Sequence, residues 1–164
     1  AVFTYITAIR MAIKNKSKQI IQKTIREMIE FEELLISFDQ ASNNIFRDVT
    51  VDKGHILHAY YCAFWGLFQF DNYKDAIDAI ICLGPEKGQK AKIAIKGKWK
   101  KNEIIVGDTD TNASITGALL GAFYGYKTLT LNEITKNNMK IMMSCDSTKG
   151  DIVRPPIYKL PNII

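Results

Sequence analysis

The sequence predicts an all-α protein. Apolar residues recur at every third or fourth position along most of the chain, and asparagine, aspartate or Gly-Pro pairs stand where these periodic segments begin or end. No internal repeat or low-complexity tract interrupts the pattern. The 164 residues include 47% hydrophobic and 24% charged positions, which is typical of one soluble globular domain. We therefore expect a single domain over residues 1–164.

Two helices are expected before residue 44. The apolar residues of segment 3–14 predict a short buried helix that ends at the polar residues 15–17. A longer helix is expected to follow and to stop near Asn43, because its apolar residues are spaced by three or four while charged residues occupy its other faces. These apolar residues are Ile21, Ile25, Met28, Phe31, Leu35 and Phe38.

The next two helices are expected to lie at the centre of the fold. Residues 54–70 include no Asp, Glu, Lys or Arg and are apolar nearly all round, which predicts one of the most buried helices. Asp71 or Asn72 is then expected to accept the free amide hydrogens at the start of a fourth helix. Gly84 and Pro85 mark its end.

A lysine-rich segment, residues 85–105, follows the fourth helix. Between residues 86 and 101, seven lysines oppose one glutamate, so the local charge is 7 − 1 = +6 in a chain of net charge +5. Apolar residues alternate with the lysines, which permits a short strand or hairpin. A solvated loop or hairpin is favoured over a nucleic-acid contact, because Trp99 is the only aromatic residue among the lysines.

The rest of the chain predicts two more helices, at residues 111–126 and 131–143, and an extended tail at residues 150–164, where prolines exclude regular helix. The fifth helix carries small residues at every fourth position, which predicts close packing of another helix against that stripe. The stripe consists of Ala113, Gly117, Gly121 and Gly125.

Two charge-free runs, residues 54–70 and 111–126, test the chain for membrane insertion. They hold 17 and 16 residues, fewer than the about 20 apolar residues of a spanning helix, and both include polar side chains. No membrane association is therefore expected. The three cysteines form no C-x-x-C pair and have apolar neighbours, which indicates reduced thiols and a cytoplasmic protein.

The segment that begins the fifth helix carries the candidate chemistry. Asp108, Asp110 and Thr111 place three oxygen-bearing side chains within four residues, and such oxygens are the ligands that Mg²⁺ and Ca²⁺ prefer. An EF-hand is excluded, since Ala113 and Leu119 occupy the positions of its turn glycine and final glutamate. Aspartate and threonine also cap helices, and for these residues alone capping is the simpler interpretation.

Other candidate groups are weaker. His55 and His58 would share one helix face, but no nearby carboxylate completes a zinc site, so we interpret both as core or edge residues. Nothing near Cys62 in the sequence would lower its pKa and make it a nucleophile. No catalytic residue is assigned.

The segment that leads into and forms the expected fifth helix is Val106-Gly107-Asp108-Thr109-Asp110-Thr111-Asn112-Ala113-Ser114-Ile115-Thr116-Gly117-Ala118-Leu119-Leu120-Gly121-Ala122-Phe123-Tyr124-Gly125. It resembles the signature of the ADP-ribosylglycohydrolase family. Residues 54–65 and 73–77 resemble the two helices that precede the signature in that family, so the likeness covers about residues 50–126. It implies an orthogonal bundle of helices and a site that binds two Mg²⁺ ions, with Asp108, Asp110 and Thr111 among the ligands. The implied reaction is hydrolysis of ADP-ribose from a modified protein side chain or from a small molecule.

Two departures from the family pattern shape the expectation. The chain holds no Thr-Asp-Asp sequence, which in the family supplies further metal ligands, so it resembles a C-terminal half whose N-terminal half would be a partner. The lysine-rich segment is an insertion where relatives pass directly from helix to signature. We expect weak metal binding by the chain alone, and uncovered apolar helix faces that promote association. The alternative is an inactive family member that has a structural or ADP-ribose-binding role.

Overall fold

The computed structural model describes residues 1–84, 107–125, 137, 140 and 141. The chain divides into two compact units, residues 1–129 and residues 130–164. Residues 137, 140 and 141 of the second unit are helical. The expected lysine-rich strand or hairpin and the extended tail lie outside the described residues, as does most of the expected sixth helix. The prediction of a single domain stays a prediction.

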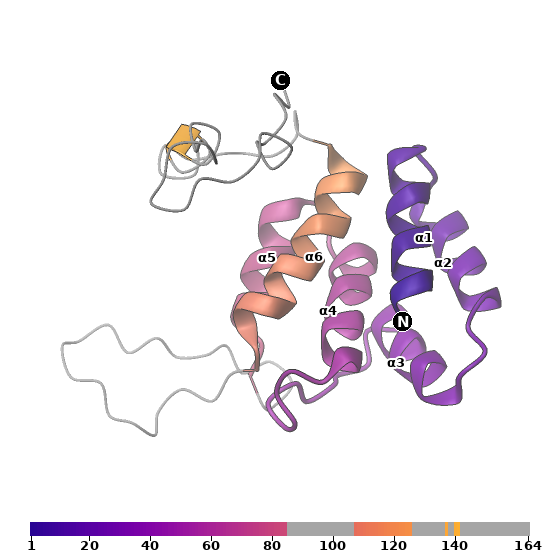
Figure 1. The fold of residues 1–164 in the computed structure, drawn as a ribbon, viewed down its shortest axis with the longest axis horizontal. Coiled ribbons are helices and arrows are strands. Elements are labelled where there is room, and N and C mark those ends of the chain that lie inside the picture. The colour runs from indigo at the N-terminus through magenta and orange to yellow at the C-terminus, as the bar shows by residue number, and fades with distance from the viewer. Residues whose placement is uncertain (85–106, 126–136, 138–139, 142–164) are drawn as a thin grey trace, which may run out of the picture. The chain divides into compact units, whose positions relative to one another are not determined.

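The described part of the first unit is formed of helices without a strand, which confirms the all-α class (Figure 1). The order along the chain is α1 (Val2–Ile13), α2 (Lys18–Glu27), α3 (Glu32–Ser42), α4 (Ile56–Gln69), α5 (Tyr73–Ile81) and α6 (Thr109–Tyr124).

The long helix expected up to Asn43 is wrong, because residues 28–31 separate α2 from α3. α2 buries Ile25, whereas α3 buries Leu34, nine positions later. Nine residues make about two and a half turns, so one straight helix would point these side chains in opposite directions. The break at residues 28–31 allows the apolar faces of both α2 and α3 to point toward the core. Arg26 of α2 donates from Nε and Nη2 to the carboxylate of Asp39 on α3, at 2.9 and 3.0 Å.

α4 is the central helix, as the sequence predicts. It packs against α3, α5 and α6, and nine of its fourteen residues are buried. Phe64 is fully buried, and its ring lies 4.9 Å from Phe38 and 4.7 Å from Tyr60, measured between centroids. The contact between Phe38 and Phe64 joins α3 to α4.

α5 begins as expected, because the Asn72 side chain accepts the Asp75 backbone N–H at 2.9 Å. The predicted small-residue stripe of α6 is only partly a packing surface. At Gly117 an added Cβ would lie 2.9 Å from the Tyr73 hydroxyl, so this glycine permits close approach of α5. At Gly121 no described atom would lie within 4 Å of an added Cβ, so the second glycine is not explained by packing among the described residues.

Within residues 1–84 and 107–125 and the three described residues beyond, no helix combines the length and apolar character needed to cross a bilayer.

Candidate metal centre

The two aspartates of the candidate site lie at the start of α6. Asp108 occupies the N-cap position, yet its side chain makes no capping hydrogen bond. Asp110 is exposed in the first turn, and its carboxyl lies within hydrogen-bonding reach of that of Asp108. The contact with Asp108 is the largest of the causes that lower the pKa of Asp110. Hydrogen bonds from the backbone N–H groups of Thr111 and of Asp110 itself lower it further. Two acidic groups therefore lie side by side, and for Asp108 the capping interpretation loses its support.

A cleft of about 630 Å³ opens beside this pair. The carboxylate-bearing wall comes from the start of α6, and Thr111 is exposed but does not line the cleft. The described lining residues are Lys53, Ile81, Gly107, Asp108, Thr109, Asp110 and Ala113. The cleft thus combines two acidic side chains with one basic side chain on a partly apolar floor.

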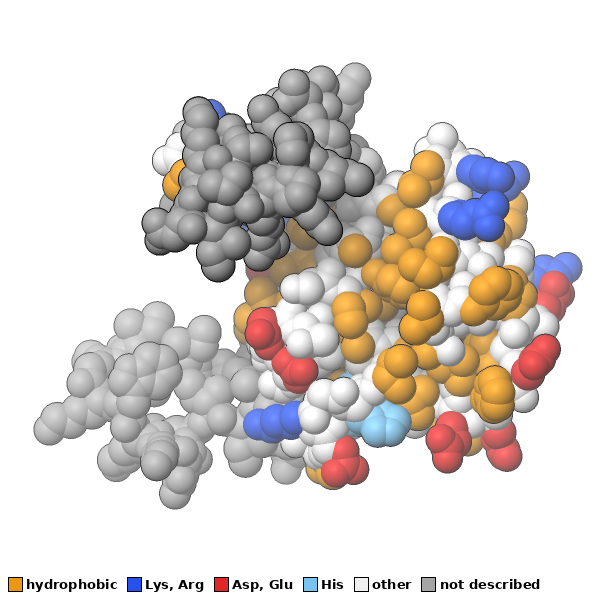
Figure 2. All heavy atoms as spheres, viewed as in Figure 1, with side chains coloured by type: hydrophobic (Ala, Val, Ile, Leu, Met, Phe, Trp, Pro, Cys, Tyr) orange, Lys and Arg blue, Asp and Glu red, His pale blue; other side chains and the backbone are white. Residues whose placement is uncertain are grey.

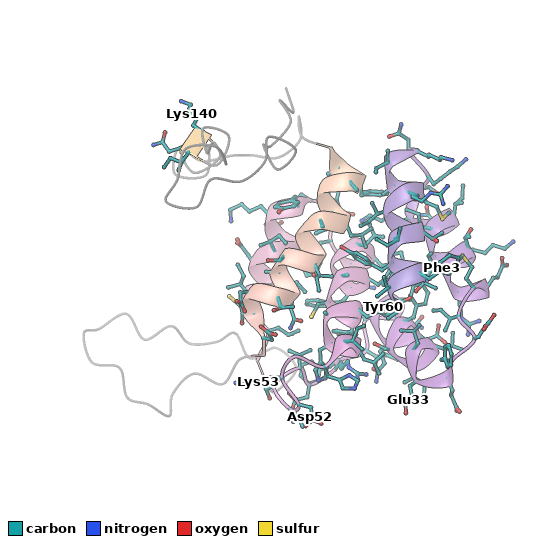
Figure 3. All side chains as sticks on the ribbon, in the orientation of Figure 1. Phe3, Glu33, Asp52, Lys53, Tyr60 and Lys140 are labelled. Carbon is teal, nitrogen blue, oxygen red and sulfur yellow. The ribbon has the colours of Figure 1, made fainter. Side chains whose placement is uncertain are left out.

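One residue of the α3–α4 loop (residues 43–55), Lys53, lines the cleft and makes its second wall. An added Cβ at Gly107 would lie only 2.6 Å from the Val49 carbonyl oxygen, so only glycine permits this approach. Gly54 has φ +85°, and an added Cβ there would lie 3.8 Å from Oδ2 of Asp108. Figure 3 shows Lys53 and Asp52 on this loop near the first turn of α6. The loop therefore supports Asp108 from the side.

This loop is the part of the site that the sequence interpretation missed. Val49 and Lys53 precede the segment whose likeness to the family is clearest, and neither has a motif of its own. The sequence holds one local signal, because Asp48 and Thr50 have the spacing of an Asx turn. In the structure the Asp48 carboxylate accepts hydrogen bonds from the Thr50 N–H at 2.8 Å and from the Thr50 hydroxyl at 2.6 Å. That signal predicts an ordered turn but gives no indication of its partner.

The donor set fits a hard divalent cation in part. Asp108 and Asp110 supply neighbouring carboxyl oxygens beside the cleft, and such oxygens are the ligands that hard divalent cations prefer. In the part of the chain that the structure describes, no group of three or more His, Cys, Asp or Glu side chains could hold a metal ion. Two carboxylates alone leave most of the six oxygen positions of Mg²⁺ to water or to other ligands. The pair therefore forms a partial site.

The weaker candidates have structural roles. His55 is the N-cap of α4 and accepts the Leu57 N–H through Nδ1 at 3.2 Å. His58 is buried, and both of its ring nitrogens have protein partners. Burial raises the pKa of the Cys62 thiol to about 12, which disfavours a thiolate nucleophile. These positions agree with the core and edge roles expected from the sequence.

The comparisons with known proteins identify one family. Residues 104–136 of the 164 match the family model described as ADP-ribosylglycohydrolase. The chain matches no curated protein and no solved structure. The matched segment contains Gly107, both aspartates and the whole of α6. Over residues 104–136, the chain is thus similar to the ADP-ribosylglycohydrolases, as its sequence predicts.

Proposed function

We propose that this chain forms part of a magnesium-dependent site that hydrolyses ADP-ribose from a modified protein side chain or another acceptor. The observation that carries the proposal is the family match at residues 104–136, which includes the aspartate pair at the cleft. The neighbouring carboxyls of Asp108 and Asp110, both of which line the cleft, support it, because Mg²⁺ prefers carboxylate oxygens as ligands.

The roles of the chain's own residues follow from their chemistry. Asp108, Asp110 and Thr111 would hold metal through oxygen atoms. Bound Mg²⁺ would polarise water and neutralise negative charge as the acceptor departs. Val49 and Gly107 would keep the Asp108 segment in place, since their backbones are in close contact. Because the sequence holds no Thr-Asp-Asp, the remaining ligands would come from a further segment or partner half.

The test is an assay of ADP-ribose release from modified arginine and serine peptides with Mg²⁺. It uses the chain alone and the chain with any upstream coding sequence restored. We expect release by the restored form and its loss in Asp110→Asn. The matched control is Asp78→Asn, which changes an exposed carboxylate that pairs with Lys74 on α5, outside the cleft. No turnover by the restored form, or equal activity in Asp110→Asn, would overturn the proposal.

A second candidate is ADP-ribose binding without hydrolysis. It is favoured by Lys53, whose positive charge at the cleft suits a diphosphate, and by the absence of a three-ligand metal group among the described residues. Calorimetric titration of ADP-ribose without metal should then give measurable affinity, weakened about tenfold by Lys53→Ala. Lys74→Ala, a change at an exposed lysine of α5, should leave the affinity unchanged. Equal affinity of the two variants would exclude this role for Lys53.

A further inference from the structure

We infer that His58 is a positioning residue for the proposed metal site: its neutral imidazole ties the α3–α4 loop to α4 and so keeps the wall beside Asp108 in place. The inference rests on the proposed function for its link to metal. The tie between His58 and the loop can be tested without metal.

The hydrogen bonds of His58 define its protonation. Arg47 donates from Nε to Nδ1 of His58 at 3.1 Å, and a guanidinium can only donate, so Nδ1 is the acceptor. The proton therefore lies on Nε2, which donates to the Val51 carbonyl oxygen at 2.8 Å. Burial lowers the pKa of His58, and the charge of Arg47 adds to the lowering, so the ring is neutral near pH 7. Arg47 also donates from Nη1 to Oε1 of Gln40 on α3 at 3.0 Å, which anchors the network.

Val51 lies between the two loop residues that approach the Asp108 segment. On one side, Val49 is in close contact with Gly107, and on the other, Gly54 lies near Oδ2 of Asp108. The bond from His58 thus holds the middle of a short segment whose two ends support the candidate ligand. Loss of this bond would free the segment between Val49 and Gly54 and weaken the support of Asp108.

A second tie from α4 to the same loop provides a matched control. The Tyr61 hydroxyl donates to the Ile45 carbonyl oxygen at 3.1 Å. This bond also joins α4 to the loop, but it lies four residues before Val49. Removal of the Tyr61 hydroxyl should therefore cost a similar hydrogen bond without moving the wall beside Asp108.

The experiment compares the full-length wild type with His58→Ala, His58→Gln and Tyr61→Phe. Amide hydrogen exchange is measured for residues 49–54, and Mn²⁺ affinity by electron paramagnetic resonance. In His58→Ala we expect exchange in this segment to accelerate roughly fivefold and Mn²⁺ affinity to fall about tenfold. The glutamine amide can donate through its NH₂ group and accept through its carbonyl oxygen, so His58→Gln should recover most of both losses. Tyr61→Phe should match wild type in both measurements.

The outcomes separate this inference from the proposed function. If wild type binds no Mn²⁺, the metal site fails, while hydrogen exchange still tests the tie. Unchanged exchange over residues 49–54 in His58→Ala would overturn the inference, as would equal losses in His58→Gln and His58→Ala. If His58→Ala does not fold, Arg47→Met removes the donor to Nδ1 and should accelerate the same exchange. Wild-type exchange in that variant would also overturn the inference.

Discussion

Helices α1 and α4 are both apolar, yet they bury their side chains in different ways. α4 buries large residues on nearly every side, among them Tyr61, Phe64 and Leu67. α1 buries only small residues, Thr4, Ala8 and Ala12, and exposes large ones. The exposed fractions are 66% for Val2, 74% for Phe3, 47% for Ile6 and 64% for Ile13. Figure 2 shows hydrophobic side chains gathered on the face over α1 and α2.

The difference shows that apolar composition does not reveal which side of a helix faces the core. The small residues of α1 allow its backbone to lie close to its neighbours, where Thr4 and Tyr60 share a hydrogen bond at 3.0 Å and the Tyr5 hydroxyl donates to the Ile115 carbonyl at 2.7 Å. Beside this contact lies an apolar groove of about 270 Å³, lined in part by Val2 and Ile6. Association through uncovered apolar faces stays a prediction, and this face is where it can be tested.

The largest expected effect is at the centre of α4. Phe64→Ala would remove a fully buried ring that contacts Phe38, Tyr60 and Phe68, and we expect the free energy of unfolding to fall by about 3–5 kcal/mol. Urea denaturation followed by circular dichroism measures this change. A loss below about 1 kcal/mol would mean that α4 is not the centre of the core.

A smaller loss is expected where α4 and α6 meet. An added Cβ at Gly66 would lie 2.7 Å from Cγ2 of Thr116, so Gly66→Ala should destabilise the protein by about 1–3 kcal/mol. Thr116→Ser removes that methyl group, and the double variant should recover part of the loss, as a double-mutant cycle would show. Additive losses would contradict the close contact.

Acidification should lower the free energy of unfolding through His58, which lies on α4. The pKa of His58 lies below its ordinary value of 6.5, first because the ring is buried, so the unfolded chain binds this proton more readily than the folded one. Stability should therefore be complete above about pH 6.5 and should decline as the pH falls toward the lowered pKa. Thermal unfolding between pH 7.5 and 5 measures the slope, and His58→Gln should flatten it. An equal slope in that variant would assign the loss to other groups.

The smallest effect on stability is expected on the outer face of α1. Ile6→Gln should change the free energy of unfolding by no more than about 0.5 kcal/mol, because the side chain is already half exposed. Sedimentation velocity of the same variant tests the surface, since a less apolar face should lower self-association. A destabilisation comparable to that of Phe64→Ala would show that α1 does not differ from α4.

Local signals predicted most helices. The expected helix at residues 54–70 is observed as α4, Ile56–Gln69, and the one at 111–126 as α6, Thr109–Tyr124. Asn72 was named as a possible cap and caps α5. The break between α2 and α3 was not predicted, because no glycine or proline marks it and the three-to-four spacing continues through it.

The candidate site also has one part that could be predicted from the sequence and one part that could not. Asp108 and Asp110 are two positions apart, so their proximity follows from the chain itself, and the family likeness rests on the same residues. The contact that holds the α3–α4 loop beside them joins Val49 to Gly107, which are 58 positions apart and share no sequence pattern that would pair them.

The sequence alone therefore determined the helix ends, the apolar periodicity and the acidic pair, because each depends on residues within a turn or two of one another. Three features arose from packing: the inward side of α1, the break that turns α2 and α3 to the core, and the loop that supports Asp108. Each depends on contacts between residues that are far apart in the sequence. The free energy gained when such surfaces are buried against one another depends on how the whole fold packs.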